Sequence, residues 1–170
     1  MKEKIPHRKQ IRLNDYDYSQ EGYYFITICT QNRKQILSRI INDFEPQKNT
    51  KHVGANCVRP QIKLTNIGII SEKEINRISK IYENVIIDEY IIMPNHIHII
   101  VEILDGRTQF APTISQIIKQ FKGIITKTIG YNIWQKSFYE HIIRNEKEYF
   151  LTKQYIQNKP INWYEDKYYK

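Results

Sequence analysis

Two histidines, His96 and His98, open an apolar run and stand two residues apart. In a β-strand, residues i and i+2 point to the same face, so both imidazoles would project from one face while Ile97 and Ile99 pack on the other. Two adjacent imidazoles supply half of a metal site, and imidazole alone favours zinc or another transition metal. A structural histidine pair is the alternative, because short motifs of this kind often match by chance.

The second group that could do chemistry is a phenol near the C-terminus, Tyr155. A phenol with its usual pKa of about 10 is a poor nucleophile, but it becomes useful when a metal polarises an electrophile such as a phosphodiester. The chain has 13 tyrosines, and most tyrosines are packing residues. Composition alone therefore does not distinguish Tyr155 from Tyr139 or Tyr149.

Several other classes of protein are disfavoured. No glutamate follows the histidines at the helical spacing of a zinc protease, and the six glycines form no phosphate-binding loop. Cys29 and Cys57 lack a Cys-x-x-Cys spacing, which disfavours a disulfide framework and a zinc ribbon. No targeting signal and no apolar run of about 20 residues is found, so we expect a cytoplasmic protein without a membrane partner.

The charge of the chain points to a polyanionic partner. Its 26 lysines and arginines exceed its 18 acidic residues, giving a net charge of +8 that is concentrated toward both ends. Lysines that only solubilise the surface are the alternative interpretation. The candidate contacts to a DNA backbone are Arg8, Lys9, Arg12, Lys119, Lys122 and Lys127.

The apolar patterns predict one α+β domain over residues 1–170, an antiparallel sheet with helices packed on it. Residues 1–21 form a basic arm and residues 160–170 a polar, aromatic tail. Strands are predicted over 22–30, 35–41, 61–64, 85–93, 96–104 and 137–143, and helices over 66–82, 113–129 and 146–159. The candidate helix N-caps are Thr65 or Asn66, Thr113 or Ser115, and Asn145, and Gly130 would end the second helix.

Three motifs resemble one family, the REP-associated tyrosine transposases. The first is Pro94-Asn95-His96-Ile97-His98, preceded by Tyr-Tyr-Phe-Ile-Thr-Ile-Cys-Thr-Gln-Asn-Arg at 23–33. The block Trp-Gln-Lys-Ser-Phe-Tyr-Glu-His-Ile-Ile-Arg at 134–144 is similar to the family's Trp-Gln…Phe-x-x-His block, and Tyr155-Ile156-x-x-x-Pro160 to its last helix. The resemblance covers nearly the whole chain and implies the ferredoxin-like or RRM-like fold of the HUH single-tyrosine transposases.

The resemblance also implies roles for these residues. His96 and His98 would hold Mg²⁺ or Mn²⁺, which orients the scissile phosphate of single-stranded DNA beside a hairpin and neutralises developing charge. Tyr155 would attack the phosphorus, leaving a 5′-phosphotyrosine and a free 3′-hydroxyl that can reverse the step. His141, in the second motif, could orient the site or bind substrate, although a core or surface histidine is an equal alternative.

One position departs from the family's pattern. The family usually has Tyr-Ile-x-x-Asn-Pro, and on a helix the residue four after the tyrosine shares its face and would meet the metal. Here that residue is Lys159, whose charged ammonium is no metal ligand, and Asn158 stands one place early. Three outcomes are open: a weakened third ligand, a metal ligand from Asn158, or a Lys159 that replaces metal charge by contacting phosphate.

The sequence therefore supports three hypotheses. The first is a DNA strand-transfer enzyme, monomeric or homodimeric, with Tyr155 as its nucleophile. The second is a catalytically inactive DNA-hairpin-binding module, descended from such an enzyme and disabled by Lys159. The third is a nickase like those that initiate replication, which a test of strand rejoining separates from the first.

Overall fold

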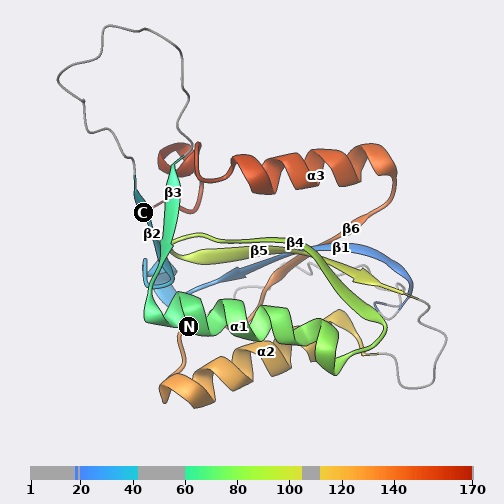
Figure 1. The fold of residues 1–170 in the computed structure, drawn as a ribbon, viewed down its shortest axis with the longest axis horizontal. Coiled ribbons are helices and arrows are strands. Elements are labelled where there is room, and N and C mark those ends of the chain that lie inside the picture. Colours follow the sequence, from blue (N-terminus) through green and yellow to red (C-terminus); the bar gives the residue numbers. More distant parts are fainter. Residues whose placement is uncertain (1–17, 19, 42–59, 105–111, 170) are drawn as a thin grey trace, which may run out of the picture.

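Four antiparallel strands form the centre of the structure, and helices cover both faces of their sheet (Figure 1). The computed structural model describes residues 18, 20–41, 60–104 and 112–169. Most of the predicted arm over 1–21 and of the predicted loops over 42–60 and 105–112 lies outside the described residues.

The strands of the main sheet follow the order β4-β5-β1-β6, and β2 and β3 form a separate two-stranded sheet. The strands are β1 (Gly22–Cys29), β2 (Ser38–Ile41), β3 (Gln61–Leu64), β4 (Val85–Ile92), β5 (His96–Ile103) and β6 (Tyr139–Ile143). The α-helices are α1 (Asn66–Ile81), α2 (Ile114–Ile129) and α3 (Glu146–Asn158), and short 3₁₀ turns lie at η1 (Gln31–Arg33) and η2 (Trp163–Glu165).

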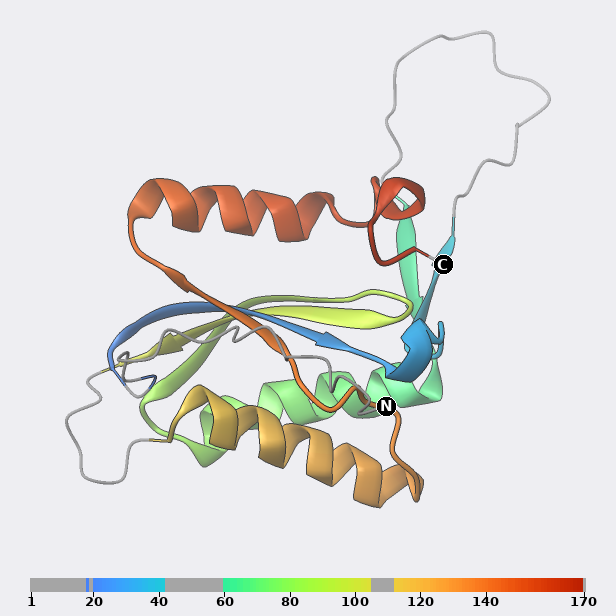
Figure 2. The same ribbon diagram turned by 180° about the vertical axis from the view of Figure 1, so that it is seen from behind.

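Helices α1 and α2 cover one face of the main sheet and α3 covers the other, as the two opposite views show (Figures 1 and 2). The chain order β1-α1-β4-β5-α2-β6 with this sheet order is the ferredoxin-like arrangement. The predicted class, α+β with an antiparallel sheet and packed helices, is confirmed.

The alternation of side chains along β5 divides the core in two. Ile97 and Ile99 are fully buried in the larger core, together with the apolar residues of α1 and α2. Ile100 points the other way and packs with Ile156 of α3 in a smaller cluster. Because side chains alternate along a strand, His96 and His98 share the face of Ile100, toward α3.

The predicted N-caps of the three helices and the predicted end of the second helix are confirmed. Each of these residues satisfies a backbone group that would have no partner within the helix. The caps are Thr65, which accepts from the Gly68 amide; Thr113, which forms a capping box with Gln116; Asn145, which accepts from the Glu148 amide; and Gly130, in the left-handed region with φ 84°.

Two predicted strands are shorter than expected. The prediction of a strand from residue 35 is wrong by three residues, because the left-handed Asn32 and Arg33 form η1 and ladder pairing begins only at Ser38. Residues 137 and 138 also precede β6, which pairs with β1 from Tyr139 onward. None of the helices in the described residues is long and apolar enough to cross a membrane.

Candidate active site

The histidine pair lies at the start of β5, in the middle of the sheet. His96 and His98 are 0% and 1% exposed, and their ring centroids are 4.6 Å apart. In the ladder with β1, His98 pairs with Thr27 and His96 with Cys29. The predicted common orientation of the two imidazoles is thereby confirmed.

Asn95 holds the His96 ring in one orientation. The Asn95 amide nitrogen donates to the backbone carbonyls of Arg33 (3.3 Å) and Tyr168 (2.6 Å), so the Asn95 carbonyl oxygen faces His96 Nδ1 at 2.8 Å. A carbonyl oxygen only accepts, so Nδ1 carries the proton and Nε2 keeps its lone pair. His96 is therefore set up to ligate through Nε2.

Thr27 performs a similar role for His98, since its hydroxyl lies 2.9 Å from His98 Nδ1 and leaves Nε2 without a hydrogen-bond partner. Burial lowers the pKa of His96 to about 3; the negative charge of Asp166 acts against this shift and the positive charge of Lys159 acts with it. Burial and the neighbouring His96 lower the pKa of His98 well below its usual value. Both rings are therefore neutral near pH 7, as metal binding requires.

We expect the metal-free protein to lose stability as the pH falls below 6.5. Both folded-state pKa values lie below that of an unfolded histidine, so between pH 6.5 and about 3 the unfolded chain binds protons that the folded protein does not. Each histidine then removes about 1.4 kcal/mol of unfolding free energy per pH unit. Urea unfolding at several pH values measures this slope. A His96→Gln/His98→Gln double variant should flatten it, and equal slopes in the two proteins would contradict the assignment.

Helix α3 brings Tyr155 to the histidine pair. The ring centroid of Tyr155 lies 5.4 Å from that of His98 and 6.0 Å from that of Phe25 on β1, and the residue is 40% exposed. Tyr139, on β6, also contacts Phe25, with 6.5 Å between ring centroids, but of the three tyrosines it is Tyr155 whose ring contacts His98. The Tyr149 hydroxyl donates to Asp88. The tertiary structure thus selects Tyr155 from the three.

Polar contacts at both edges of the sheet fix α3 in place. On β4, Asp88 accepts from the Tyr149 hydroxyl at 3.0 Å and pairs with Lys153 at 3.1 Å. On β6, His141 Nε2 lies 2.6 Å from the Glu148 carboxylate. His141 therefore contacts the first turn of α3, the helix that carries Tyr155.

The segment after α3, residues 160–169, lies against the histidine pair. Trp163 is 3% exposed, and the Tyr168 ring centroid lies 4.5 Å from that of His96. Arg33 holds the segment by donating to the Lys167 carbonyl at 2.6 Å. Burial raises the pKa of Tyr168 to about 12, which makes this second nearby phenol a weaker nucleophile than an ordinary tyrosine.

Lys159 points into the site and is paired there. Its ammonium lies 2.8 Å from Asp166 Oδ2 and 4.3 Å from the Tyr155 ring centroid, and the residue is 6% exposed. Asp166 Oδ2 also lies 3.7 Å from His96 Nε2, where the neutral imidazole makes no ion pair. Of the two alternatives at the end of α3, the structure therefore places Lys159 at the histidines.

Asn158 has no hydrogen bond to either imidazole, because both Nε2 atoms are without a partner and both Nδ1 atoms are bonded elsewhere. Its backbone carbonyl accepts from the amides of Ile161 and Asn162. Within the described residues, no three His, Cys, Asp or Glu side chains are clustered as a metal site.

The candidate DNA-contacting residues that the structure describes do not gather at the histidine pair. Arg8, Lys9 and Arg12 lie outside the described residues. The lysines of α2 lie on the opposite side of the sheet from α3 (Figure 2). Of these, Lys122 donates to the carbonyls of Gln135 and Ser137, which gives it a structural role.

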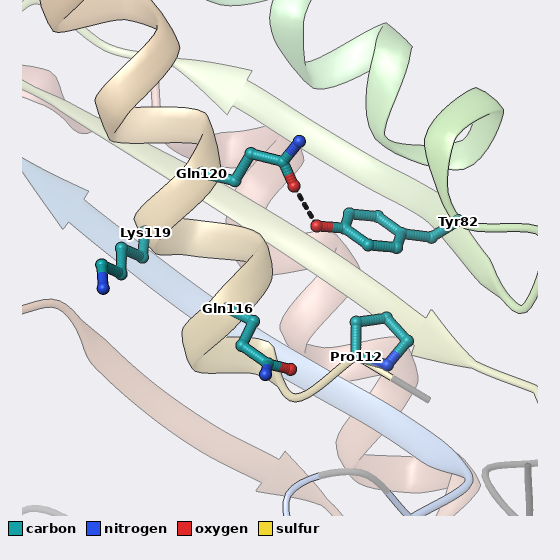
Figure 3. A pocket seen from close by; sticks show the side chains of 5 residues that line it. All are labelled: Tyr82, Pro112, Gln116, Lys119 and Gln120. Atoms are coloured by element: carbon teal, nitrogen blue, oxygen red, sulfur yellow. Dashed lines mark hydrogen bonds between the residues drawn. The ribbon is translucent and has the colours of Figure 1, made fainter. Parts of the chain in front are cut away.

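Lys119 is exposed and lines a pocket of about 550 Å³ together with Tyr82, Pro112, Gln116 and Gln120 (Figure 3). The Tyr82 hydroxyl donates to Gln120 in this pocket. Lys127 is exposed on the same helix. That these lysines contact DNA stays a prediction.

Sequence reasoning missed three residues of the site: Thr27, Asn95 and Asp166. Asn95 had a signal, since it adjoins His96 in the first motif, but no role was assigned to it. Thr27 and Asp166 are far from the histidines in sequence and belong to no motif of polar residues. Only the β1–β5 register and the path of the C-terminal segment bring them to the imidazoles.

Comparisons with known proteins agree with this fold. No protein-family model matches the chain. A Haemophilus influenzae protein whose name assigns no function is 36% identical over 97% of this chain and 94% of its own length. An Escherichia coli K12 protein named REP-associated tyrosine transposase is 37% identical over 44% of this chain and 44% of its own length. Another H. influenzae protein, provisionally given the same name, is 25% identical over 85% of this chain and 73% of its own length.

Among solved structures, a REP-associated tyrosine transposase bound to a REP hairpin superposes on this chain with a TM-score of 0.61. The match covers 89% of this chain and 74% of that one at 23% sequence identity, which establishes a shared fold. The two chains thus share one fold.

Proposed function

Since this chain belongs to the REP-associated tyrosine transposase family, we propose that it cleaves and rejoins single-stranded DNA beside a hairpin. The observation that carries the proposal is the position of Tyr155, beside His98 and within reach of solvent. The phenol of Tyr155 and the imidazoles of His96 and His98 belong to one chain, which supports a site formed within a single chain.

In the proposed reaction, the Tyr155 oxygen attacks the phosphorus of a single-stranded phosphodiester. A bond forms between phosphorus and the phenolic oxygen, and the bond from phosphorus to the 3′ oxygen breaks. The phenol loses its proton to solvent and the 3′ oxygen takes one up, leaving a 5′-phosphotyrosine and a 3′-hydroxyl. Because the phosphotyrosine is still a phosphodiester, attack by a 3′-hydroxyl rejoins the strand without an external energy source.

The cofactor we propose is a divalent metal, Mg²⁺ or Mn²⁺, held by His96 and His98. The residues fit such an ion, because both imidazoles are neutral, oriented through Nδ1 and unpartnered at Nε2. When bound, a divalent ion withdraws charge from phosphate oxygens and orients the phosphate. The protein's own part is to hold the rings still, through Asn95 and Thr27.

The proposed substrate is hairpin-bearing DNA. A net charge of +8 suits a polyanion, and the solved relative is bound to a REP hairpin. Arg8, Lys9, Arg12, Lys119 and Lys127 are the proposed backbone contacts. A protein with this substrate would work in the cytoplasm, where chromosomal DNA is found.

The proposal is tested by incubating the purified chain with Mn²⁺ and a library of labelled oligonucleotides, each with a hairpin beside a single-stranded segment. We expect a covalent protein–DNA product that survives denaturing electrophoresis and that nuclease treatment converts to near-free protein. Addition of an acceptor strand with a 3′-hydroxyl should release rejoined DNA. Cleavage without rejoining would instead favour a nickase.

Two observations favour the second candidate, a hairpin-binding module without catalysis. The histidines are buried under the C-terminal segment, and the ammonium of Lys159 lies at the position where a metal-facing amide was expected. Salt-dependent hairpin binding with no adduct in Mg²⁺, Mn²⁺, Co²⁺ or Zn²⁺ would establish this alternative and contradict the first.

A further inference from the structure

Three buried polar atoms of the candidate site have no hydrogen-bond partner. They are His96 Nε2, His98 Nε2 and Asp166 Oδ2, and they make up three of the five such side-chain atoms among the described residues. Buried polar atoms are nearly always hydrogen-bonded. Asp166 Oδ2 is ion-paired with Lys159, so the two imidazole nitrogens are the atoms that call for an explanation such as an absent ion. Two imidazole nitrogens and a carboxylate oxygen are a familiar donor set for a divalent transition metal.

The two carboxylate oxygens of Asp166 have different neighbours. Oδ1 accepts from the Tyr168 amide at 2.9 Å, while Oδ2 lies 2.8 Å from the Lys159 ammonium and 3.7 Å from His96 Nε2. The backbone on either side is fixed, because Asn95 donates to the Tyr168 carbonyl and Trp163 is buried. The same Asn95 thus orients both the His96 ring and the segment that carries Asp166.

Lys159 supplies the positive charge that this carboxylate needs. The two side chains are 7% and 0% exposed, and their contact at 2.8 Å is an ion pair without hydrogen-bond geometry at Oδ2. A buried carboxylate is stable only beside a cation, and a metal ion could replace the ammonium in that role. No contact found for Asn158 offers a comparable ligand.

We propose that Asp166 is the third metal-coordinating residue of the His96–His98 site, and that Lys159 is its counter-ion in the metal-free protein. The inference rests on the proposed function, since it assumes that the histidines bind a metal. Two ligand atoms at about 2.1 Å from one ion lie about 3 to 3.4 Å apart, so the 3.7 Å between Oδ2 and Nε2 requires only a small shift.

The test is Mn²⁺ binding, followed by the EPR signal of free Mn²⁺ during titration of the full chain without DNA. Asp166→Asn should weaken binding by at least about tenfold, because it removes a direct ligand. Lys159→Met should strengthen binding severalfold, because it removes a competing cation. Glu165→Gln is the matched control: it makes the same change of charge one residue away, on an exposed side chain, and should leave affinity unchanged.

A second measurement distinguishes direct coordination of Mn²⁺ by Asp166 from an effect of its charge without coordination. With carboxylate-¹³C aspartate incorporated, ENDOR of bound Mn²⁺ should show coupling to a carboxylate carbon in the wild type and in Glu165→Gln. Absence of this coupling in the wild type, or Asp166→Asn binding as tightly as Glu165→Gln, overturns the role of Asp166. Weaker binding by Lys159→Met overturns its role as a competing counter-ion.

A different result would contradict the proposed function. If a His96→Asn/His98→Asn variant binds Mn²⁺ as the wild type does, the histidines are not the metal site. If that variant loses Mn²⁺ while Asp166→Asn keeps it, the histidine site stands and only the inference about Asp166 is overturned.

Discussion

Tyr155→Phe is expected to abolish the covalent protein–DNA product, by at least ~1000-fold, while changing hairpin affinity by less than about twofold. The substitution removes only the attacking oxygen. The remaining ring can keep its contacts with Phe25 and His98 and its place under the Lys159 ammonium, so α3 should not move. Denaturing electrophoresis measures the product, and a hairpin titration at fixed salt measures affinity.

Tyr168→Phe is the critical control for this prediction. The Tyr168 ring is as close to the histidines as that of Tyr155, but burial raises the pKa of its hydroxyl to about 12. Tyr139→Phe makes the same change on the more distant β6. Both variants should retain the product. If Tyr155→Phe retains the product and Tyr168→Phe loses it, the nucleophile is Tyr168.

Gly68→Ala is expected to destabilise the fold by about 3 kcal/mol or more, a large share of a typical domain's stability. Gly68 lies in the first turn of α1, and a Cβ there would stand 2.0 Å from the Leu37 carbonyl oxygen. That carbonyl already accepts from the amide and the hydroxyl of Thr65, so it is not free to move. Urea unfolding monitored by circular dichroism gives the loss of free energy.

Gly123→Ala provides the matched control in another helix. Gly123 is exposed in the middle of α2, and a Cβ there would meet nothing within 4 Å. Alanine is the better helix former, so this variant should gain about 0.5–1 kcal/mol. If both variants lose a similar amount, the close approach of α1 to Leu37 is not the cause.

Local rules account for the elements that were correctly predicted. The β5 strand follows from alternation, because one face of a central strand must enter the larger core. Thr65, Thr113 and Asn145 were among the candidate caps because helix starts leave amides unpaired wherever they occur, and the structure selected Thr65 over Asn66 and Thr113 over Ser115. Such signals lie within a few residues of the element that they describe.

The end of α3 shows where local rules fail. Helical spacing correctly placed residue 159 on the face of Tyr155, but spacing could not say what a lysine does there. Its partner, Asp166, lies beyond the end of the helix, in a segment predicted only as a polar, aromatic tail. The Lys159–Asp166 pair is buried because residues 160–169 pack against the histidines of β5.

The sequence predicted the fold class and the shared face of His96 and His98, because periodicity is a property of neighbours along the chain. Tyr155 was named as the candidate nucleophile only through the family resemblance. Only the tertiary structure decided which tyrosine stands beside the imidazoles, which atoms hold their rings, and which carboxylate faces them. The physical reason is that Thr27, Asn95, Tyr155 and Asp166 come from four separate segments. Their contacts exist only after β1 pairs with β5, α3 crosses the sheet and the C-terminal segment packs on the histidines.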